Sequence, residues 1–92
     1  MIPRQITREL LIRAAETIER NGIPENRKST RYNVLVNGNK YPPKYLIAVA
    51  SKLAFGKMIS AQSYNGGLES NSFLRGSGFS ITNKIGEIIN HP

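Results

Sequence analysis

The sequence predicts a small α+β domain, and three segments carry that prediction. Apolar residues recur at helical spacing over residues 7–22, a β-branched run leads into an Asn-Gly pair at 37–38, and a second apolar helix follows the prolines at 42–43. We therefore expect an N-terminal helix, a β-hairpin, a core helix, a short third helix and a closing strand. The helices should pack on one face of a small antiparallel sheet.

The first helix has recognisable signals at both ends. Thr7 is a good N-cap, and Ile6 before it can pack against Leu11 as a hydrophobic staple. Gly22 suits the left-handed position that ends a helix, and Pro24 prevents its continuation. The stripe expected to be buried consists of Leu10, Leu11, Ala14, Ala15 and Ile18. Because its charges balance, we assign this helix to the scaffold.

A hairpin is predicted next. The run 32–36 is β-branched and aromatic, and Asn-Gly is the preferred pair for a type I′ turn. In that register Val34 lies opposite Tyr41, and Leu35 lies opposite Lys40. The helix–hairpin arrangement is comparable to a winged helix, with Asn37-Gly38 as the wing tip, although this comparison is only an analogy.

The core helix begins at the prolines. Pro43 suits the first helical turn, where its missing N–H costs nothing, and Gly56 is expected to stop the helix. Helical spacing predicts two sets of side chains. The buried set is Leu46, Ile47, Val49, Ala50, Leu53 and Ala54, and the exposed set is Lys44, Ser51 and Lys52.

The remainder is rich in glycine and serine. We expect a short helix around Glu69–Arg75, with Phe73 and Leu74 toward the core, and a closing strand over Phe79–Ile81. Residues 1–83 are assigned to the domain, and residues 84–92 to a linker or the start of a next element. No internal repeat is visible.

Length and composition exclude several classes of protein. Ninety-two residues, 39% of them hydrophobic, suffice for one modest core. The absence of cysteine excludes disulfides and thiolate metal sites. The longest apolar run is too short to cross a bilayer, so no membrane partner is expected. The N-terminus lacks the apolar region of a signal peptide, which makes a cytoplasmic location the expectation.

The net charge of +7 is concentrated in the middle of the chain. Bases and acids cancel in residues 1–25 and again in residues 69–92. Residues 26–68 contain no acidic residue and hold seven bases: Arg27, Lys28, Arg31, Lys40, Lys44, Lys52 and Lys57. Such a distribution favours a polyanionic partner, most simply nucleic acid. The alternative is a solvated basic face that serves solubility.

Catalysis is poorly supported by the residue types. There is no aspartate or cysteine, the only histidine is His91, and the glutamates are not grouped at metal-ligand spacing. A Ser–Lys dyad from Ser51-Lys52 or Ser29 is formally possible, but such pairs are common by chance. We therefore predict no catalytic residue, no metal site and no cofactor in this chain.

Binding chemistry is better supported. Lysine and arginine neutralise phosphates, while tyrosine stacks on bases or hydrogen-bonds a phosphate. Tyr41 and Tyr45 are better explained as core residues, and the glycines at 66–67 as an ordinary loop or as an approach for an anion. The candidate nucleic-acid contacts are Arg27, Lys28, Arg31, Lys40, Lys44, Lys52, Tyr64, Asn65, Gly66, Gly67 and Asn71.

The order of short motifs resembles a known family. Tyr41-Pro42-Pro43-Lys44 opens the core helix, Gly66-Gly67 precedes Glu69 and Asn71, and Gly78-Phe79-Ser80-Ile81 closes the domain. This ordered set resembles the N-terminal head domain of McrA-like (ScoMcrA-like) HNH modification-dependent restriction endonucleases, over nearly the whole of residues 6–81.

The resemblance implies a non-catalytic module of a type IV restriction enzyme. Its expected partners are double-stranded DNA, with a modified base as an open possibility, and an HNH nuclease domain of the same polypeptide, since this chain has no HNH motif. The alternative is a head that docks on protein or dimerises, using Ile85, Ile88 and Ile89. Binding of RNA or single strands is a third possibility, and would require exposed tyrosines on a sheet face.

Overall fold

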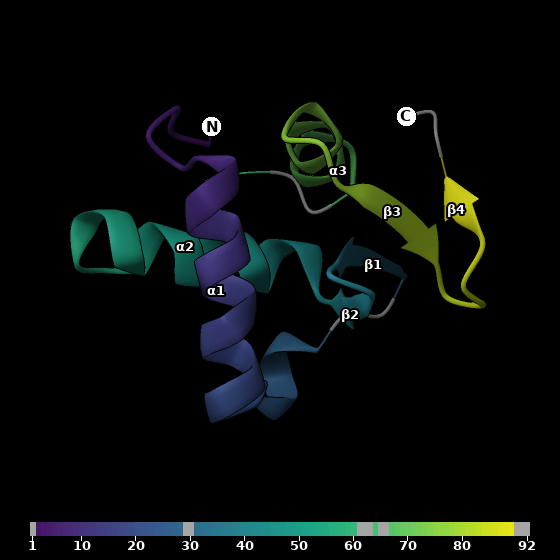
Figure 1. The fold of residues 1–92 in the computed structure, drawn as a ribbon, viewed down its shortest axis with the longest axis horizontal. Helices are drawn as coiled ribbons and strands as arrows, with labels where there is room; N and C mark the ends of the chain where they lie inside the picture. The colour runs from purple at the N-terminus through teal and green to yellow at the C-terminus, as the bar shows by residue number, and fades with distance from the viewer. Residues whose placement is uncertain (1, 29–30, 61–63, 65–66, 90–92) are drawn as a thin grey trace.

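The computed structural model describes residues 2–28, 31–60, 64 and 67–89. In this part of the chain it contains three α-helices and a four-stranded antiparallel sheet in the order β2-β1-β3-β4 (Figure 1). The predicted α+β class is therefore confirmed. The helices are α1 (Arg8–Asn21), α2 (Pro43–Phe55) and α3 (Leu68–Gly76), and the strands are β1 (Tyr32–Val36), β2 (Asn39–Tyr41), β3 (Ser80–Asn83) and β4 (Ile88–Ile89). A single 3-10 turn, η1 (Glu25–Arg27), links α1 to the sheet.

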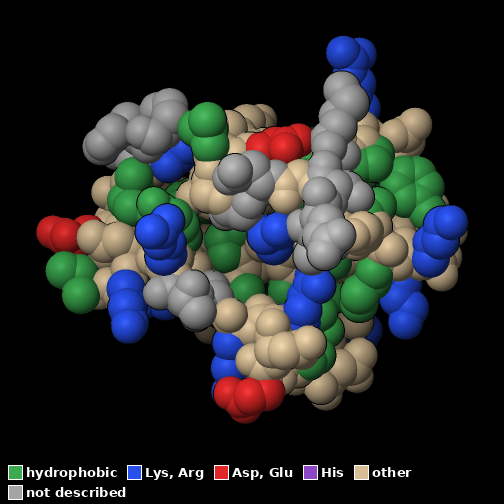
Figure 2. All heavy atoms as spheres, turned by 180° about the vertical axis from the view of Figure 1, so that it is seen from behind, with side chains coloured by type: hydrophobic (Ala, Val, Ile, Leu, Met, Phe, Trp, Pro, Cys, Tyr) green, Lys and Arg blue, Asp and Glu red, His purple; other side chains and the backbone are tan. Residues whose placement is uncertain are grey.

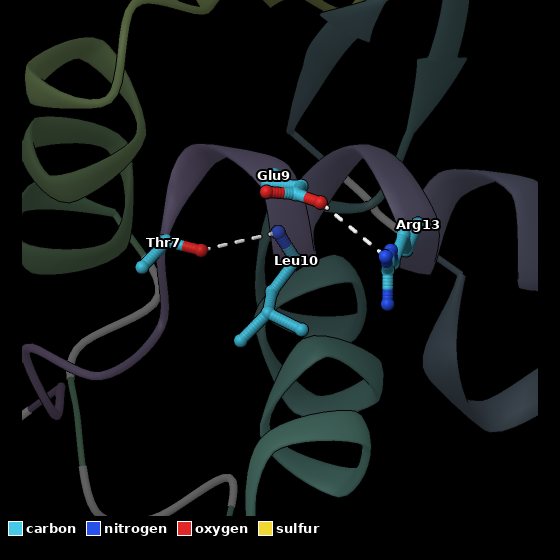
Figure 3. A network of polar contacts seen from close by, with 4 residues as sticks. All are labelled: Thr7, Glu9, Leu10 and Arg13. Carbon is cyan, nitrogen blue, oxygen red and sulfur yellow. Dashed lines mark hydrogen bonds and ion pairs between the residues drawn. The ribbon is translucent and has the colours of Figure 1, made fainter.

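Helix α1 begins and ends where its caps predict. The Thr7 hydroxyl accepts a hydrogen bond from the Leu10 N–H at 3.3 Å, and the neighbouring Glu9 forms an exposed ion pair with Arg13 at 3.3 Å (Figure 3). At the other end, Gly22 has φ 79° and its N–H donates to the Ile18 carbonyl. A left-handed φ of this kind favours glycine.

The hairpin has the predicted register. Val34 pairs with Tyr41 and Leu35 with Lys40, across a turn in which Asn37 has φ 52° and Gly38 φ 83°. Because alternate side chains face opposite sides of a sheet, Val34 and Tyr41 lie on the core side and Lys40 on the other. The winged-helix analogy stays a prediction.

The core lies between the helices and one face of the sheet. Helix α1 crosses α2, and the strands lie at the N-terminal end of α2 (Figure 1). The fully or nearly fully buried apolar side chains include Leu11, Ala14, Ile18, Val34, Leu46, Ile47, Leu74 and Ile81. Helix α2 starts at Pro43 and ends before Gly56, which has φ 84°, as expected.

Two predictions about α2 were wrong. Ser51 was expected to be exposed but is completely buried, and Leu53 was expected in the buried stripe but is 46% exposed. The reason is that α2 does not lie on the surface along its whole length. Its middle is enclosed on all sides, from Leu46 to Ser51, and its last turn emerges from the domain.

The C-terminal part contains one element that the sequence analysis did not predict. Strand β4 pairs Ile89 with Ile81 and Ile88 with Thr82, and so extends the sheet into residues assigned to a linker or next element. The Arg75 Nε atom donates to the Ile89 carbonyl at 3.1 Å, which ties this strand to α3. The third helix and the closing strand were predicted, and each spans slightly different residues from those expected.

Candidate nucleic-acid interface

The basic segment contributes two cations, Arg27 and Lys44, around the first turn of α2. Arg27 at the end of η1 places its guanidinium carbon 5.4 Å from the centre of the Tyr45 ring, and Lys44 places its Nζ 5.0 Å from the centre of the Tyr64 ring. The Tyr64 hydroxyl donates a hydrogen bond to the Lys44 carbonyl at 2.8 Å. These contacts bring residues from η1, α2 and the segment before α3 to one place. We call Arg27, Lys44, Tyr45 and Tyr64 the basic end of α2.

The ionisation of Tyr64 reports on the charges around it. Burial raises the pKa of Tyr64 to about 12, the positive charge of Arg27 works against that rise, and Glu69 adds to it. Arg27 and Glu69 therefore both act electrostatically on this tyrosine. The basic end thus has one carboxylate as a neighbour and is not purely cationic.

The Arg27 guanidinium is incompletely satisfied. Its Nη2 atom is buried and has no hydrogen-bond partner among the described residues. The nearest acid in sequence, Glu25, pairs instead with Lys28 at 3.4 Å. An unpaired buried donor normally costs about 1–3 kcal/mol, so the position of this guanidinium is not explained by its hydrogen bonds.

The first turn of α2 is not neutralised by its own residues. Pro42 provides no side-chain cap, the first turn has no acidic residue, and Lys44 lies within it. The N-terminus of a helix carries partial positive charge from its free N–H groups, which adds to that of the lysine. An anion is favoured at such a position.

Arg31 is exposed just before β1, in the segment that follows Arg27 in the sequence. Lys40 lies apart from the basic end: it is exposed, and its Nζ is on the outer face of the sheet beside Gly86 in the β3–β4 turn. Lys52 is exposed near the other end of α2. The structure therefore brings only some of the predicted bases together.

The polar candidates near α3 are mostly buried. Tyr64 is 4% exposed, so its ring covers the core and does not present a free face for base stacking. Asn71 is also 4% exposed, and its Oδ1 atom has no partner among the described residues. Gly67 is the N-cap of α3. Asn65 and Gly66 lie outside the described residues, as do Ser29 and His91.

Tyr45 packs against the core, as expected, and is half-buried. Its ring also carries the Arg27 guanidinium, a contact that was not predicted. An aromatic residue in the first turn of a helix after two prolines was the available signal. Tyr41 is also a core residue as expected, with its hydroxyl donating to Glu19 at 2.7 Å.

Metal binding and membrane insertion have no visible basis in the described residues. Among them, no three His, Cys, Asp or Glu side chains are grouped closely enough to hold a metal ion. No helix in the same residues has the length and apolar character needed to cross a membrane.

Fold and site together define a small basic α+β domain with two of its cations, Arg27 and Lys44, at one helix end. The family model described as "ScoMcrA-like, N-terminal head domain" matches residues 4–83. The chain therefore belongs to the family of ScoMcrA-like N-terminal head domains, as its motifs suggested. No curated protein matches the chain significantly, and neither does any solved structure.

Proposed function

We propose that this chain binds double-stranded DNA as the non-catalytic head of a modification-dependent HNH restriction endonuclease. The observation that carries the proposal is the basic end of α2. There, Arg27 and Lys44 lie on tyrosine rings, and a buried Arg27 nitrogen has no partner among the described residues. A phosphate group would pair with the partly exposed side chains of Arg27 and Lys44 and offset the positive charge of the helix end.

The neighbouring bases extend this surface. Arg31 and Lys28 are exposed in the segment that precedes β1, close in sequence to Arg27. Lysine and arginine side chains are spread over much of the face seen in Figure 2, with few acidic side chains among them. Contacts of this kind bind the phosphate backbone and carry little sequence information by themselves. Family membership supports restriction of DNA as the context, with a nuclease domain of the same polypeptide as partner.

The test is the salt dependence of duplex binding by the variant Arg31→Ala/Lys44→Ala. Each lost phosphate contact reduces the slope of log affinity against log salt by about 0.9, so the slope should fall by about two units at most. The matched control Arg13→Ala/Arg20→Ala removes two exposed arginines from α1 and should leave affinity unchanged within about twofold. Equal effects of both pairs would refute the site. Duplex binding that does not respond to salt would refute the function.

Duplexes of one sequence that differ only in cytosine modification distinguish two modes of binding: a clamp that contacts only the phosphate backbone, and a reader that recognises a modified base. Equal affinity for unmodified, cytosine-methylated and hydroxymethylated DNA would indicate a clamp whose enzyme recognises the modification elsewhere. A preference of about tenfold, or 1.4 kcal/mol, would make this domain the reader.

A further inference from the structure

The C-terminal end of α2 exposes three large apolar side chains that the core does not use. Leu53 is 46% exposed, Phe55 45% and Met58 41%. Single exposed apolar residues are ordinary on soluble domains, but here three lie within six consecutive residues. Leu53 and Phe55 are two positions apart and face different sides of the last helical turn, so this end of α2 is apolar on more than one side. We call Leu53, Phe55 and Met58 the apolar knob.

The knob is held in a fixed shape. The Gly56 N–H donates to the Lys52 carbonyl at 2.8 Å and closes the helix. The buried Ser51 hydroxyl accepts from the Ile59 N–H at 2.9 Å, and Ile59 packs against the core. The segment after α2 is therefore folded back and anchored. A preformed apolar surface loses little conformational entropy when a partner covers it.

The knob lies away from the basic end of α2. In Figure 1, α2 continues beyond α1 to the side of the molecule opposite β4, and the knob is at that end. At about 1.5 Å per residue, Lys44 and Phe55 are separated by roughly 16 Å along the helix axis. A ligand at one end therefore leaves the other end accessible.

Charge around the knob selects the kind of partner. Lys52 and Lys57 are exposed beside it, and residues 26–68 contain no acid. Where α2 ends, at the right edge of Figure 2, apolar and basic side chains adjoin. An apolar centre with a polar rim is the usual composition of a protein interface, and Phe and Met are enriched there. Like charges across an interface are costly, so carboxylates are the favoured counterpart of this rim. Nucleic acid would satisfy the lysines but leave Leu53 and Met58 without an apolar counterpart.

We infer that the apolar knob docks into an apolar groove bordered by Asp and Glu side chains on a protein partner. This surface is separate from the proposed DNA site and does not depend on it. It also differs from the pair Ile85 and Ile88 at the β3–β4 turn, which are 80% and 56% exposed. That turn contains both Glu87 and Lys84, so its charges cancel. It therefore favours neither an acidic nor a basic partner.

The test is an NMR titration of the 92-residue chain with two synthetic amphipathic helical peptides. Both peptides, roughly 18 residues or five turns long, share one leucine face, and their polar faces are Glu in one and Lys in the other. We expect the Glu peptide to bind at least about tenfold more tightly and to shift the amide signals of residues 52–59. The variant Lys52→Glu/Lys57→Glu should reverse the preference between the peptides.

Two further variants complete the test. Leu53→Ser/Phe55→Ser/Met58→Ser alters only exposed side chains and should abolish Glu-peptide binding while leaving duplex DNA affinity unchanged. The matched control Ile85→Ser/Ile88→Ser should bind the peptide as the wild type does. Equal binding of the two peptides, shifts centred on residues 85–88, or dimerisation of the chain through residues 53–58 would each overturn the inference.

Discussion

The two ends of α2 differ in chemistry although one enclosed segment positions both. At the N-terminal end, Lys44 and Tyr45 are half-buried, with the Lys44 Nζ over the Tyr64 ring and the Arg27 guanidinium over the Tyr45 ring. At the C-terminal end, the apolar knob is open to solvent. Between them every residue from Leu46 to Ser51 is buried. The middle of α2 is therefore part of the core, whereas its two ends differ in exposure and in chemistry.

The largest expected effect comes from the enclosed middle. Leu46 is completely buried, so Leu46→Ala should lower the free energy of unfolding by about 2–5 kcal/mol through lost burial and a cavity. Leu53→Ala is the same chemical change on the exposed end of the same helix and should cost less than about 0.5 kcal/mol. Urea denaturation followed by circular dichroism measures both. Similar losses would contradict the division of α2 into an enclosed middle and a free end.

The second-largest effect is expected at Ser51, whose hydroxyl anchors the segment that carries the apolar knob. Ser51→Ala leaves the Ile59 N–H without its acceptor and should cost about 1–3 kcal/mol. Protection of the Ile59 amide against hydrogen exchange should fall at the same time. Ser72→Ala, at an exposed position of α3, should stay within about 0.5 kcal/mol of the wild type. An unchanged Ile59 exchange rate in Ser51→Ala would show that the knob is held by other contacts.

A smaller effect distinguishes two arginines. Arg27→Met removes a guanidinium with an unpaired buried nitrogen and should change the free energy of unfolding by less than about 1 kcal/mol, because the lost contact with Tyr45 is offset by relief of that nitrogen. Arg8→Met removes a satisfied guanidinium, which donates to the Ser77 carbonyl at 2.8 Å and lies 4.5 Å from the centre of the Phe79 ring.

We expect Arg8→Met to lower the free energy of unfolding by about 1–2 kcal/mol. Duplex DNA affinity should show the reverse order, falling several-fold in Arg27→Met and remaining unchanged in Arg8→Met. A larger loss of stability in Arg27→Met than in Arg8→Met would mean that Arg27 is a structural residue.

The ionisation of the buried tyrosines, Tyr41 and Tyr64, has the smallest expected effect on stability at neutral pH. Burial raises the pKa of Tyr41 to about 12, assisted by its hydrogen bond to Glu19, and burial raises the pKa of Tyr64 to about 12 as well. Since the folded state holds these protons more tightly than the unfolded chain, their contribution is fully present below about pH 10 and is lost as the pH rises from about 10 through 12.

Thermal unfolding measured at successive pH values should therefore show a decline that begins near pH 10. The decline should be shallower in Tyr64→Phe, which lacks the titrating hydroxyl. An equally steep decline in that variant would exclude Tyr64 as a source of the pH dependence.

Local signals in the sequence predicted much of the fold. These signals act over a few residues. The structure has the Thr7 N-cap, the left-handed Gly56, the proline at the start of α2 and the Asn-Gly turn as expected. Gly22 also ends its helix, but with φ 79° and an extended ψ of −178° in place of the left-handed helical conformation. The hairpin register followed from the turn alone, because a two-residue loop leaves one pairing that buries Val34 and Tyr41 together.

What the sequence could not supply depends on tertiary contacts. Helical periodicity assumes one buried face along the whole helix, so it misplaced Ser51 and Leu53 in a helix that is enclosed and then emerges. A two-residue strand such as β4 has no pattern of its own, and it depends on pairing with β3 and on Arg75. The basic end of α2 brings together Arg27, Lys44 and Tyr64, which are far apart in the sequence. The distribution of charge along the sequence could not distinguish these residues from Lys40 and Lys52, which lie elsewhere.

The most direct test of DNA binding at the basic end of α2 is fluorescence anisotropy of a labelled duplex, over a range of salt, with the wild type and with Arg27→Ala/Lys44→Ala. We predict salt-dependent binding by the wild type and a slope reduced by about two units at most in the variant, with affinity lower at every salt concentration. Identical slopes and affinities for the two proteins would contradict the assignment of the basic end as the DNA contact.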